Sequence, residues 1–175
     1  MRVKRMGRIK MIDPENASPE VKEAIQQHLA QGYKLTNEKK TLLHSVPCFK
    51  AIEESSYAVD RELQKIIGKR AADIYEYAIS DTNECMVCSL YFRDLLKREG
   101  IDMRTLEFTE EENLLIEYGK ALAKDPMHVP SELKDRMQKK YSDHDFVVIT
   151  TMGIMMLANN YFNEIAEVDL PEHQF

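Results

Sequence analysis

Residues 69–88 have the sequence KRAADIYEYAISDTNECMVC, which places Cys85 and Cys88 three positions apart among residues that favour helices. No run of strict polar–apolar alternation in the sequence reaches the length of a strand. We therefore expect residues 69–80 to form one helix and residues 83–99 to form the next.

The rest of the sequence has the same helical character. Capping residues stand where helices should begin, as Ser18 and Pro19 do, and glycines stand where they should end. The last segment is apolar on nearly all sides, which is typical of a central core helix or a subunit interface. Further helices are predicted over 18–32, 37–45, 47–68, 108–126, 130–142 and 142–167. The sequence thus predicts an all-α protein with one domain over residues 1–175.

The composition limits the classes of function. A length of 175 residues is enough for one domain with its own core. The formal net charge of −6 argues against nucleic-acid binding, although a basic arm of Arg2, Lys4, Arg5, Arg8 and Lys10 opens the chain. We expect that arm to be solvated. Neither a continuous apolar signal run nor a membrane span is visible, so we expect a cytoplasmic protein.

Cys85 and Cys88 lie one helical turn apart, so their sulfurs can approach each other and form a short disulfide. A close CxxC in an intracellular chain indicates redox, catalytic or metal chemistry. A cap formed by Asp81 with Glu84, or by Asn83 alone, would put Cys85 in the first helical turn, where free backbone N–H groups stabilise a thiolate. The acidic neighbours oppose that effect, and two buried core cysteines are the plainer alternative.

A zinc site is a further alternative, because His44 and Cys48 would complete a Cys3His set with Cys85 and Cys88. Pro47 is expected to put His44 and Cys48 on different helices, and one CxxC does not specify zinc. We therefore expect no metal and no organic cofactor. The other histidines are expected at the surface: His28, His128, His144 and His173.

The order of these features resembles the carboxymuconolactone decarboxylase family, in its alkylhydroperoxidase D-like branch. The resemblance rests on four segments: TLLHSVPCFKAI (41–52), KRAADIYEYAISDTNECMVC (69–88), FTEEENLLIEYGKALAKDP (108–126) and SDHDFVVITTMGIMMLANNYFNEIAEV (142–168). It implies a compact multi-helix fold and a homo-oligomer, since members of this family associate. Asn159, Asn160 and Asn163 in the last segment are expected to bond neighbouring backbone or to cross an interface.

In that family's peroxidase pattern, eleven residues separate an acid from CxxC, and three residues separate CxxC from a histidine. Carried over by position, the resemblance implies that Cys88 attacks a peroxide as a thiolate. Cys85 then resolves the sulfenic acid to a disulfide. The acid position holds Asp73, but the histidine position holds Phe92, which cannot transfer a proton. Loss of such a group typically costs about 10²–10⁴ in rate.

Three residues are candidates for the missing proton transfer. Asp73 can serve alone if burial raises its pKa toward the working pH. Tyr77, one turn beyond Asp73, is a candidate to pass a proton or to hold the carboxylate. His44 is a candidate to reach the cysteines from another helix. The plainer alternatives are a surface acid, a packed aromatic ring and a histidine at a helix end, respectively.

The sequence therefore favours a CxxC-dependent thiol–disulfide redox protein that resembles alkylhydroperoxidases. Its partners would be a hydroperoxide or disulfide substrate and an external thiol reductant, with no nucleic acid and no membrane. An alternative from another class is a non-catalytic helical oligomer or redox-responsive binding module that has lost the proton-relay histidine. Decarboxylation of a lactone acid is less attractive, because that reaction has no use for CxxC.

Overall fold

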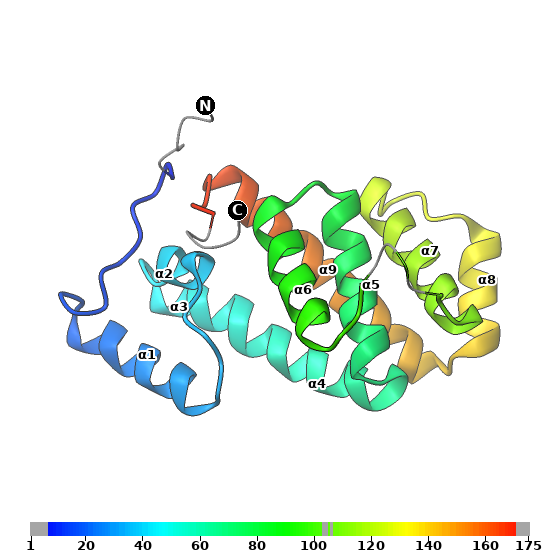
Figure 1. Cartoon of the computed structure of the whole chain (residues 1–175), viewed down its shortest axis with the longest axis horizontal. Helices are drawn as coiled ribbons and strands as arrows, with labels where there is room; N and C mark the ends of the chain where they lie inside the picture. The colour runs from blue at the N-terminus through cyan, green and yellow to red at the C-terminus, as the bar shows by residue number, and fades with distance from the viewer. Residues whose placement is uncertain (1–6, 103–104, 106, 171–175) are drawn as a thin grey trace.

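The computed structural model describes residues 7–102, 105 and 107–170. Every regular element within these ranges is helical, so the all-α prediction is confirmed. The elements in chain order, shown in Figure 1, are α1 (Pro19–Ala30), α2 (Asn37–Leu42), α3 (Val46–Phe49), the π-helical turn η1 (Lys50–Glu54), α4 (Ser55–Ile67), α5 (Lys69–Thr82), α6 (Met86–Arg98), α7 (Glu110–Lys124), α8 (Ser131–Lys140) and α9 (Asp143–Ile165).

The starts of three helices follow local signals in the sequence. The Ser18 side chain accepts a backbone N–H at the start of α1, as predicted. Thr109 and Glu112 form the predicted capping box of α7, and Ser142 and Asp145 form another at α9. Each of these caps satisfies N–H groups that the first helical turn leaves free, so it fixes where its helix begins.

Helix α9 lies at the centre of the molecule. It contacts α4, α5, α6, α7 and α8, and Figure 1 shows it passing behind α5 and α6. Gly153 on α9 allows a close approach to α5, because a Cβ there would collide with the hydroxyl of Tyr75. That hydroxyl donates to the carbonyl of Ile149 at 3.0 Å. The predicted role of the last helix as a central core helix is therefore confirmed.

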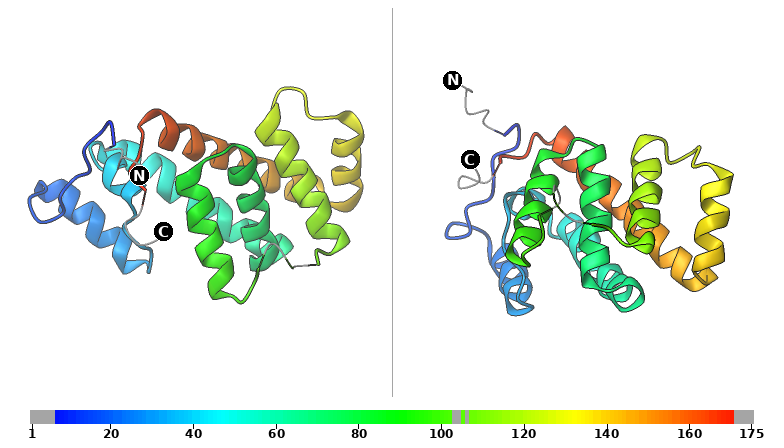
Figure 2. Two further views of the ribbon diagram at one scale, coloured as in Figure 1. Left: turned by 45° about the horizontal axis from the view of Figure 1, so that its top comes forward. Right: turned by 45° about the vertical axis from the view of Figure 1, so that its right-hand side comes forward.

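The buried apolar side chains form two separate cores. The larger one joins α4 and α5 to α7, α8 and α9, and the smaller one joins α1, α2 and α3 through Ile25, Leu43 and Phe49. Figure 2 shows α1 at one end of the molecule and α7 with α8 at the other. Figure 1 shows the short helix α2 above α1, at the same end of the molecule, and α6 in the middle of the molecule.

The chain start is described only from residue 7. Arg2, Lys4 and Arg5 of the basic arm lie outside the described residues, whereas Arg8 forms an exposed ion pair with Glu167 at 2.8 Å. Within the described ranges, no helix combines the length and the apolarity that crossing a membrane requires.

Candidate functional site

A tight turn between α5 and α6 positions Cys85. Glu84 has a φ of 57°, and the N–H groups of Glu84 and Cys85 donate to the carbonyls of Asp81 and Ser80. This is the Schellman pattern of a helix C-terminus. It stops α5 and makes Cys85 itself the N-cap of α6. The predicted start of this helix at residue 83 with an acidic or amide cap is therefore wrong, because the left-handed Glu84 interrupts the helical backbone.

The two thiols of the CxxC pair lie against each other and are buried. The Sγ of Cys85 accepts the backbone N–H of Cys88 at 3.4 Å, as a side chain at the N-cap position does. A hydrogen bond between the thiols lowers the pKa of Cys85 and raises that of Cys88 well above its ordinary value. The reduced pair therefore places its first negative charge on Cys85.

Asn163 reaches the pair from the C-terminal turn of α9. Its Nδ2 donates to the Sγ of Cys88 at 3.2 Å, and this amide lowers the pKa of both thiols. Asn163 thus bonds a cysteine thiol with its side-chain amide, where the sequence predicted backbone or interface contacts. Asn160 has a structural bond, since its Oδ1 accepts the Ser80 hydroxyl at 3.4 Å.

Glu38 on α2 brings a carboxyl group to the same place. Burial, followed by the charge of Glu53, raises the pKa of Glu38 to about 8. Charge interactions couple Glu38 to Cys85 and Cys88, while the Asn163 amide favours its ionised form. Its Oε1 is enclosed and has no hydrogen-bond partner among the described residues. Sequence reasoning missed Glu38, because no spacing rule relates it to a CxxC that follows on a different helix.

A buried lysine fixes the short helix that carries Glu38. The Nζ of Lys39 lies 3.5 Å from the carboxylate of Glu53 and donates to the carbonyl of Lys34 at 3.0 Å and to the hydroxyl of Tyr57. Glu53 belongs to the π-helical turn η1, and such turns are frequent at functional sites. These contacts hold α2 against α4, which sets the position of Glu38.

Asp73, the acid implied by the family resemblance, lies on α5 and is paired with a lysine. Its Oδ2 lies 2.6 Å from the Nζ of Lys69, which also pairs with Glu99. Burial raises the pKa of Asp73 to about 6, and the charge of Lys69 opposes this rise. The strongest charge effects on Cys88 come instead from Glu38 and Cys85. A role for Asp73 as proton acceptor stays a prediction.

The other candidates make contacts that lead away from the cysteine pair. Phe92 is buried in the larger core, so it packs where the family places a histidine. The Tyr77 hydroxyl donates to Asp81 at 3.2 Å, and the Nε2 of the exposed His44 lies 2.6 Å from the carbonyl of Lys10. Neither side chain contacts Asp73 or a thiol through these bonds.

The predicted surface location of His28 is wrong. This histidine is buried between α1 and the residues that follow, where its Nε2 lies 3.2 Å from the carbonyl of Lys34. Burial lowers the pKa of His28, and the charge of Lys39 adds to that effect. His128 and His144 are exposed as predicted, and His173 lies outside the described residues.

The structure does not assemble the Cys3His set considered for zinc. Cys48 is an exposed free cysteine on α3, and His44 bonds backbone elsewhere. Among the residues described, no group of three or more His, Cys, Asp or Glu side chains could hold a metal ion.

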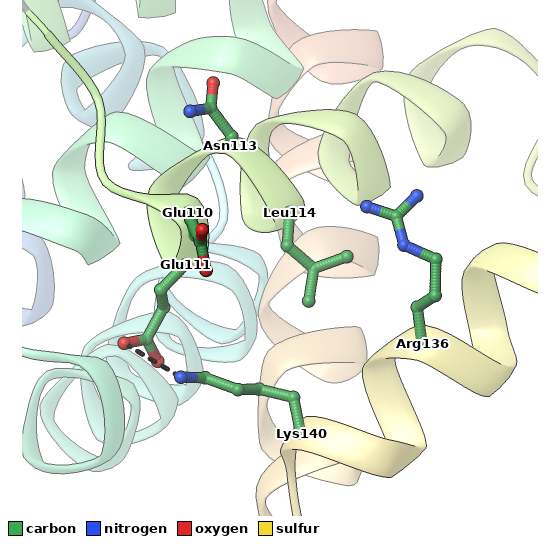
Figure 3. Close-up of a pocket in the computed structure, with 6 residues that line it drawn as sticks. All are labelled: Glu110, Glu111, Asn113, Leu114, Arg136 and Lys140. Carbon is green, nitrogen blue, oxygen red and sulfur yellow. Dashed lines mark ion pairs between the residues drawn. The ribbon is translucent and has the colours of Figure 1, made fainter.

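Two hollows at the surface lie away from this site. One, of about 450 Å³, opens between α7 and α8, where Lys140 pairs with Glu111 at 3.5 Å (Figure 3). Its lining also includes Leu114 and Arg136, which Figure 3 shows facing each other from the two helices. The other is an apolar groove along α7, α8 and α9. Neither is lined by a residue of the cysteine site.

Comparison with family models and with curated protein sequences finds no match for this chain. The family resemblance therefore rests on the four quoted segments, and the candidate site rests on its own geometry.

Proposed function

We propose that this protein is a thiol–disulfide redox protein whose centre is the Cys85–Cys88 pair. One observation carries the proposal: the two thiols contact each other at the N-terminus of α6, where the first is the helix N-cap and the second accepts the amide of Asn163. This arrangement stabilises a thiolate beside a second thiol, which is the starting state for reversible disulfide formation.

With a hydroperoxide, the thiolate sulfur attacks the terminal oxygen. An S–O bond forms, the O–O bond breaks, sulfur is oxidised, and the departing alkoxide takes a proton. The second thiol then attacks the sulfenic sulfur, so that an S–S bond forms and water leaves. An external dithiol reduces the disulfide by exchange.

The hydrogen bonds around the pair and the family resemblance differ on which cysteine attacks the peroxide. The hydrogen bonds at the N-cap favour Cys85 as the thiolate, whereas the family resemblance assigns attack to Cys88. Both orders end in the same disulfide. Trapping of the sulfenic acid in Cys85→Ser and Cys88→Ser identifies the attacking sulfur, because the variant that retains it accumulates the adduct.

The first test maps the thiols of the reduced protein by mass spectrometry after it is mixed with an alkyl hydroperoxide. A Cys85–Cys88 disulfide should form well before the exposed Cys48 is oxidised, with Cys48→Ser behaving as the parent protein does. Turnover should continue with an added dithiol and stop in both single variants of the pair. Slow and equal oxidation of all three thiols would exclude the redox centre.

A second candidate function has one observation in its favour. The exposed fraction is only 3% for Cys85 and 6% for Cys88, which suits core cysteines or a module whose disulfide responds to redox state without turnover. Reversible disulfide formation that changes association, with no consumption of hydroperoxide beyond one equivalent, would favour this module over the enzyme.

We also propose an alkylhydroperoxidase D-like fold and a homo-oligomer, as the resemblance implies. The exposed apolar side chains of α9 support association: Val147, Ile154, Tyr161 and Ile165. Light scattering of the purified protein tests this directly. A monomer at all concentrations would contradict the oligomer and leave the redox proposal standing.

A further inference from the structure

We propose that Glu38 is the acid–base group of the cysteine pair, in the place of the histidine that Phe92 replaces. This inference rests on the proposed redox function. It assigns the proton transfer to a carboxyl group from α2, outside the helices that carry the CxxC pair and the family-position acid Asp73.

The first argument is convergence of three separate helices. Glu38 comes from α2, Cys85 and Cys88 begin α6, and Asn163 comes from the C-terminal turn of α9. The Asn163 amide interacts with both thiols and with the Glu38 carboxyl, so it links the acid to the sulfurs. Glu38 is partly exposed as a residue, but its Oε1 is enclosed, and the two thiols and Asn163 are buried.

The second argument is that no cation among the described residues is shown to pair directly with Glu38. The adjacent Lys39 directs its Nζ to Glu53, to the carbonyl of Lys34 and to Tyr57, which satisfies that ammonium elsewhere. Lys39 lowers the pKa of Glu38 less than burial and Glu53 raise it. The groups that face Glu38 are therefore Glu53, Lys39, Asn163 and the two thiols, and their net effect favours the protonated carboxyl.

The third argument concerns function. A general acid–base group works best when its pKa lies near the working pH, and burial brings the pKa of Glu38 to about 8. An enclosed Oε1 without a hydrogen-bond partner is costly for stability alone, but it is free to take part in proton transfer. Asp60 and Glu76 also have an enclosed oxygen without a partner, but the causes of their pKa shifts include neither thiol, so Glu38 is distinguished by its place beside the thiols.

With Glu38 in this role, every proton transferred in the reaction has a donor and an acceptor. As the Cys85 thiolate attacks the hydroperoxide, protonated Glu38 supplies the proton that the departing alkoxide needs. The resulting carboxylate takes the proton of Cys88 as that sulfur attacks the sulfenic acid, and it passes this proton to the departing hydroxyl, which leaves as water. The negative charge of the first thiolate ends on Glu38, which regains its proton from solvent.

The test is Glu38→Gln, which keeps the shape of the side chain but cannot transfer a proton. Removing a carboxylate near the thiols should shift the ultraviolet titration of the thiolate to lower pH. Disulfide formation with an alkyl hydroperoxide should nevertheless slow by about 10²-fold, because the leaving alkoxide lacks its proton donor. More thiolate with a slower reaction is the combination that a mere charge effect cannot produce.

An aromatic disulfide reagent supplies the internal control, because its thiolate leaving group needs no proton. Glu38→Gln should react with this reagent at least as fast as the parent protein. Glu38→Asp, which keeps a carboxyl, should recover part of the hydroperoxide rate, and Glu20→Gln on exposed α1 should change nothing. Circular dichroism checks that each variant is folded.

Each outcome decides one point. A Glu38→Gln protein that reacts with hydroperoxide at the parent rate refutes the role of Glu38. If it is slow with both reagents, the substitution has displaced the thiols, and the acid–base role is also refuted. If the parent protein itself forms no disulfide with hydroperoxide, the proposed function fails, and this inference fails with it for a separate and visible reason.

Discussion

Glu38 and Asp73 are two carboxyl groups that differ in the charged and polar groups around them. Desolvation is the largest effect on both, and it raises the pKa of each. Asp73 has the ammonium of Lys69 at 2.6 Å, whereas Glu38 faces the like charge of Glu53, the amide of Asn163 and the two thiols, and Lys39 has only a smaller effect on it. The pKa of Asp73 is therefore about 6, while that of Glu38 is about 8.

The difference between these two sites teaches that the partner, more than the position in a motif, decides what a buried acid can do. A carboxyl opposite an ammonium is held ionised and contributes to packing of its helix. A carboxyl opposite a thiol keeps its proton near neutral pH and can give it up. Asp73 occupies the position that the family pattern names, whereas Glu38 has the raised pKa and the neighbouring thiols on which the proposed proton transfer depends.

The largest expected effect comes from removing the anchor of α2. Lys39→Ala leaves the carboxylate of Glu53 buried without its cation, since both side chains are less than 10% exposed in their ion pair. Breaking a buried pair in this way typically costs about 3–5 kcal/mol. The free energy of unfolding, measured by urea denaturation, should fall by that amount.

Lys65→Ala is the matched control for this experiment. Lys65 pairs with Glu62 at 2.8 Å, but its side chain is 72% exposed, and exposed pairs contribute only about 0–1 kcal/mol. Equal losses in the two variants would mean that Lys39 does not anchor α2. The position of Glu38 would then need another explanation.

The second prediction separates the two acids by pH. A carboxyl whose folded pKa is raised stabilises the protein most below its unfolded pKa, and this contribution is lost as the pH rises through the folded pKa. For Asp73 the loss runs from about pH 3.8 to about 6, and for Glu38 it runs from about 4.5 to about 8. Between about pH 6 and 8, Glu38 should thus account for a loss on the order of 2 kcal/mol.

Urea unfolding at several pH values measures this slope. Glu38→Gln should be flatter than the parent protein between about pH 6 and 8, whereas Asp73→Asn should differ from the parent mainly below about pH 6. Parallel curves for Glu38→Gln and the parent protein above pH 6 would show that Glu38 titrates near its ordinary value.

The third prediction concerns the amide that links acid and thiols. Asn163→Ala removes the donor to the Sγ of Cys88, so the pKa of both thiols should rise. The lost hydrogen bond should lower the free energy of unfolding by about 1 kcal/mol. Thiolate absorbance against pH is the measurement. Asn160→Ala is the comparison, because it breaks a bond to Ser80 instead and should leave the thiol titration unchanged.

Local chemistry explains how much of the fold could be predicted. Caps such as Ser18 and the Thr109–Glu112 box act within one turn, so the sequence places the starts of α1 and α7 correctly. The contact between Cys85 and Cys88 is also local, since it follows from a spacing of three residues on one helix. The start of α6 was missed, because a left-handed residue other than glycine has no clear signal in composition.

The remainder of the site could not be predicted, because it depends on packing between distant segments. Glu38 reaches the cysteines only because the buried Lys39 pairs with a π-helical turn, and no periodicity in the sequence reveals that pair. Asn163 lies in an apolar helix whose rotation about its own axis is set by the whole core. Tertiary contacts of this kind determine which polar residues lie together, and they cannot be predicted from spacing along the sequence.

The smallest predicted effect concerns the turn at Glu84 between α5 and α6, to which neither Glu38 nor Asp73 contributes. Glu84 adopts a left-handed conformation at the residue after the cap of α5, where glycine is the usual occupant. Such a conformation costs a residue with a Cβ about 1 kcal/mol, and glycine recovers most of this despite its greater freedom in the unfolded chain. Glu84→Gly should therefore raise the free energy of unfolding by about 0.5–1 kcal/mol, whereas Glu84→Ala should not.

Both variants remove the same charge beside Cys85, so any difference between them reports the backbone alone. A glycine variant no more stable than the alanine variant would mean that the turn is held by its hydrogen bonds to Ser80 and Asp81 without conformational strain.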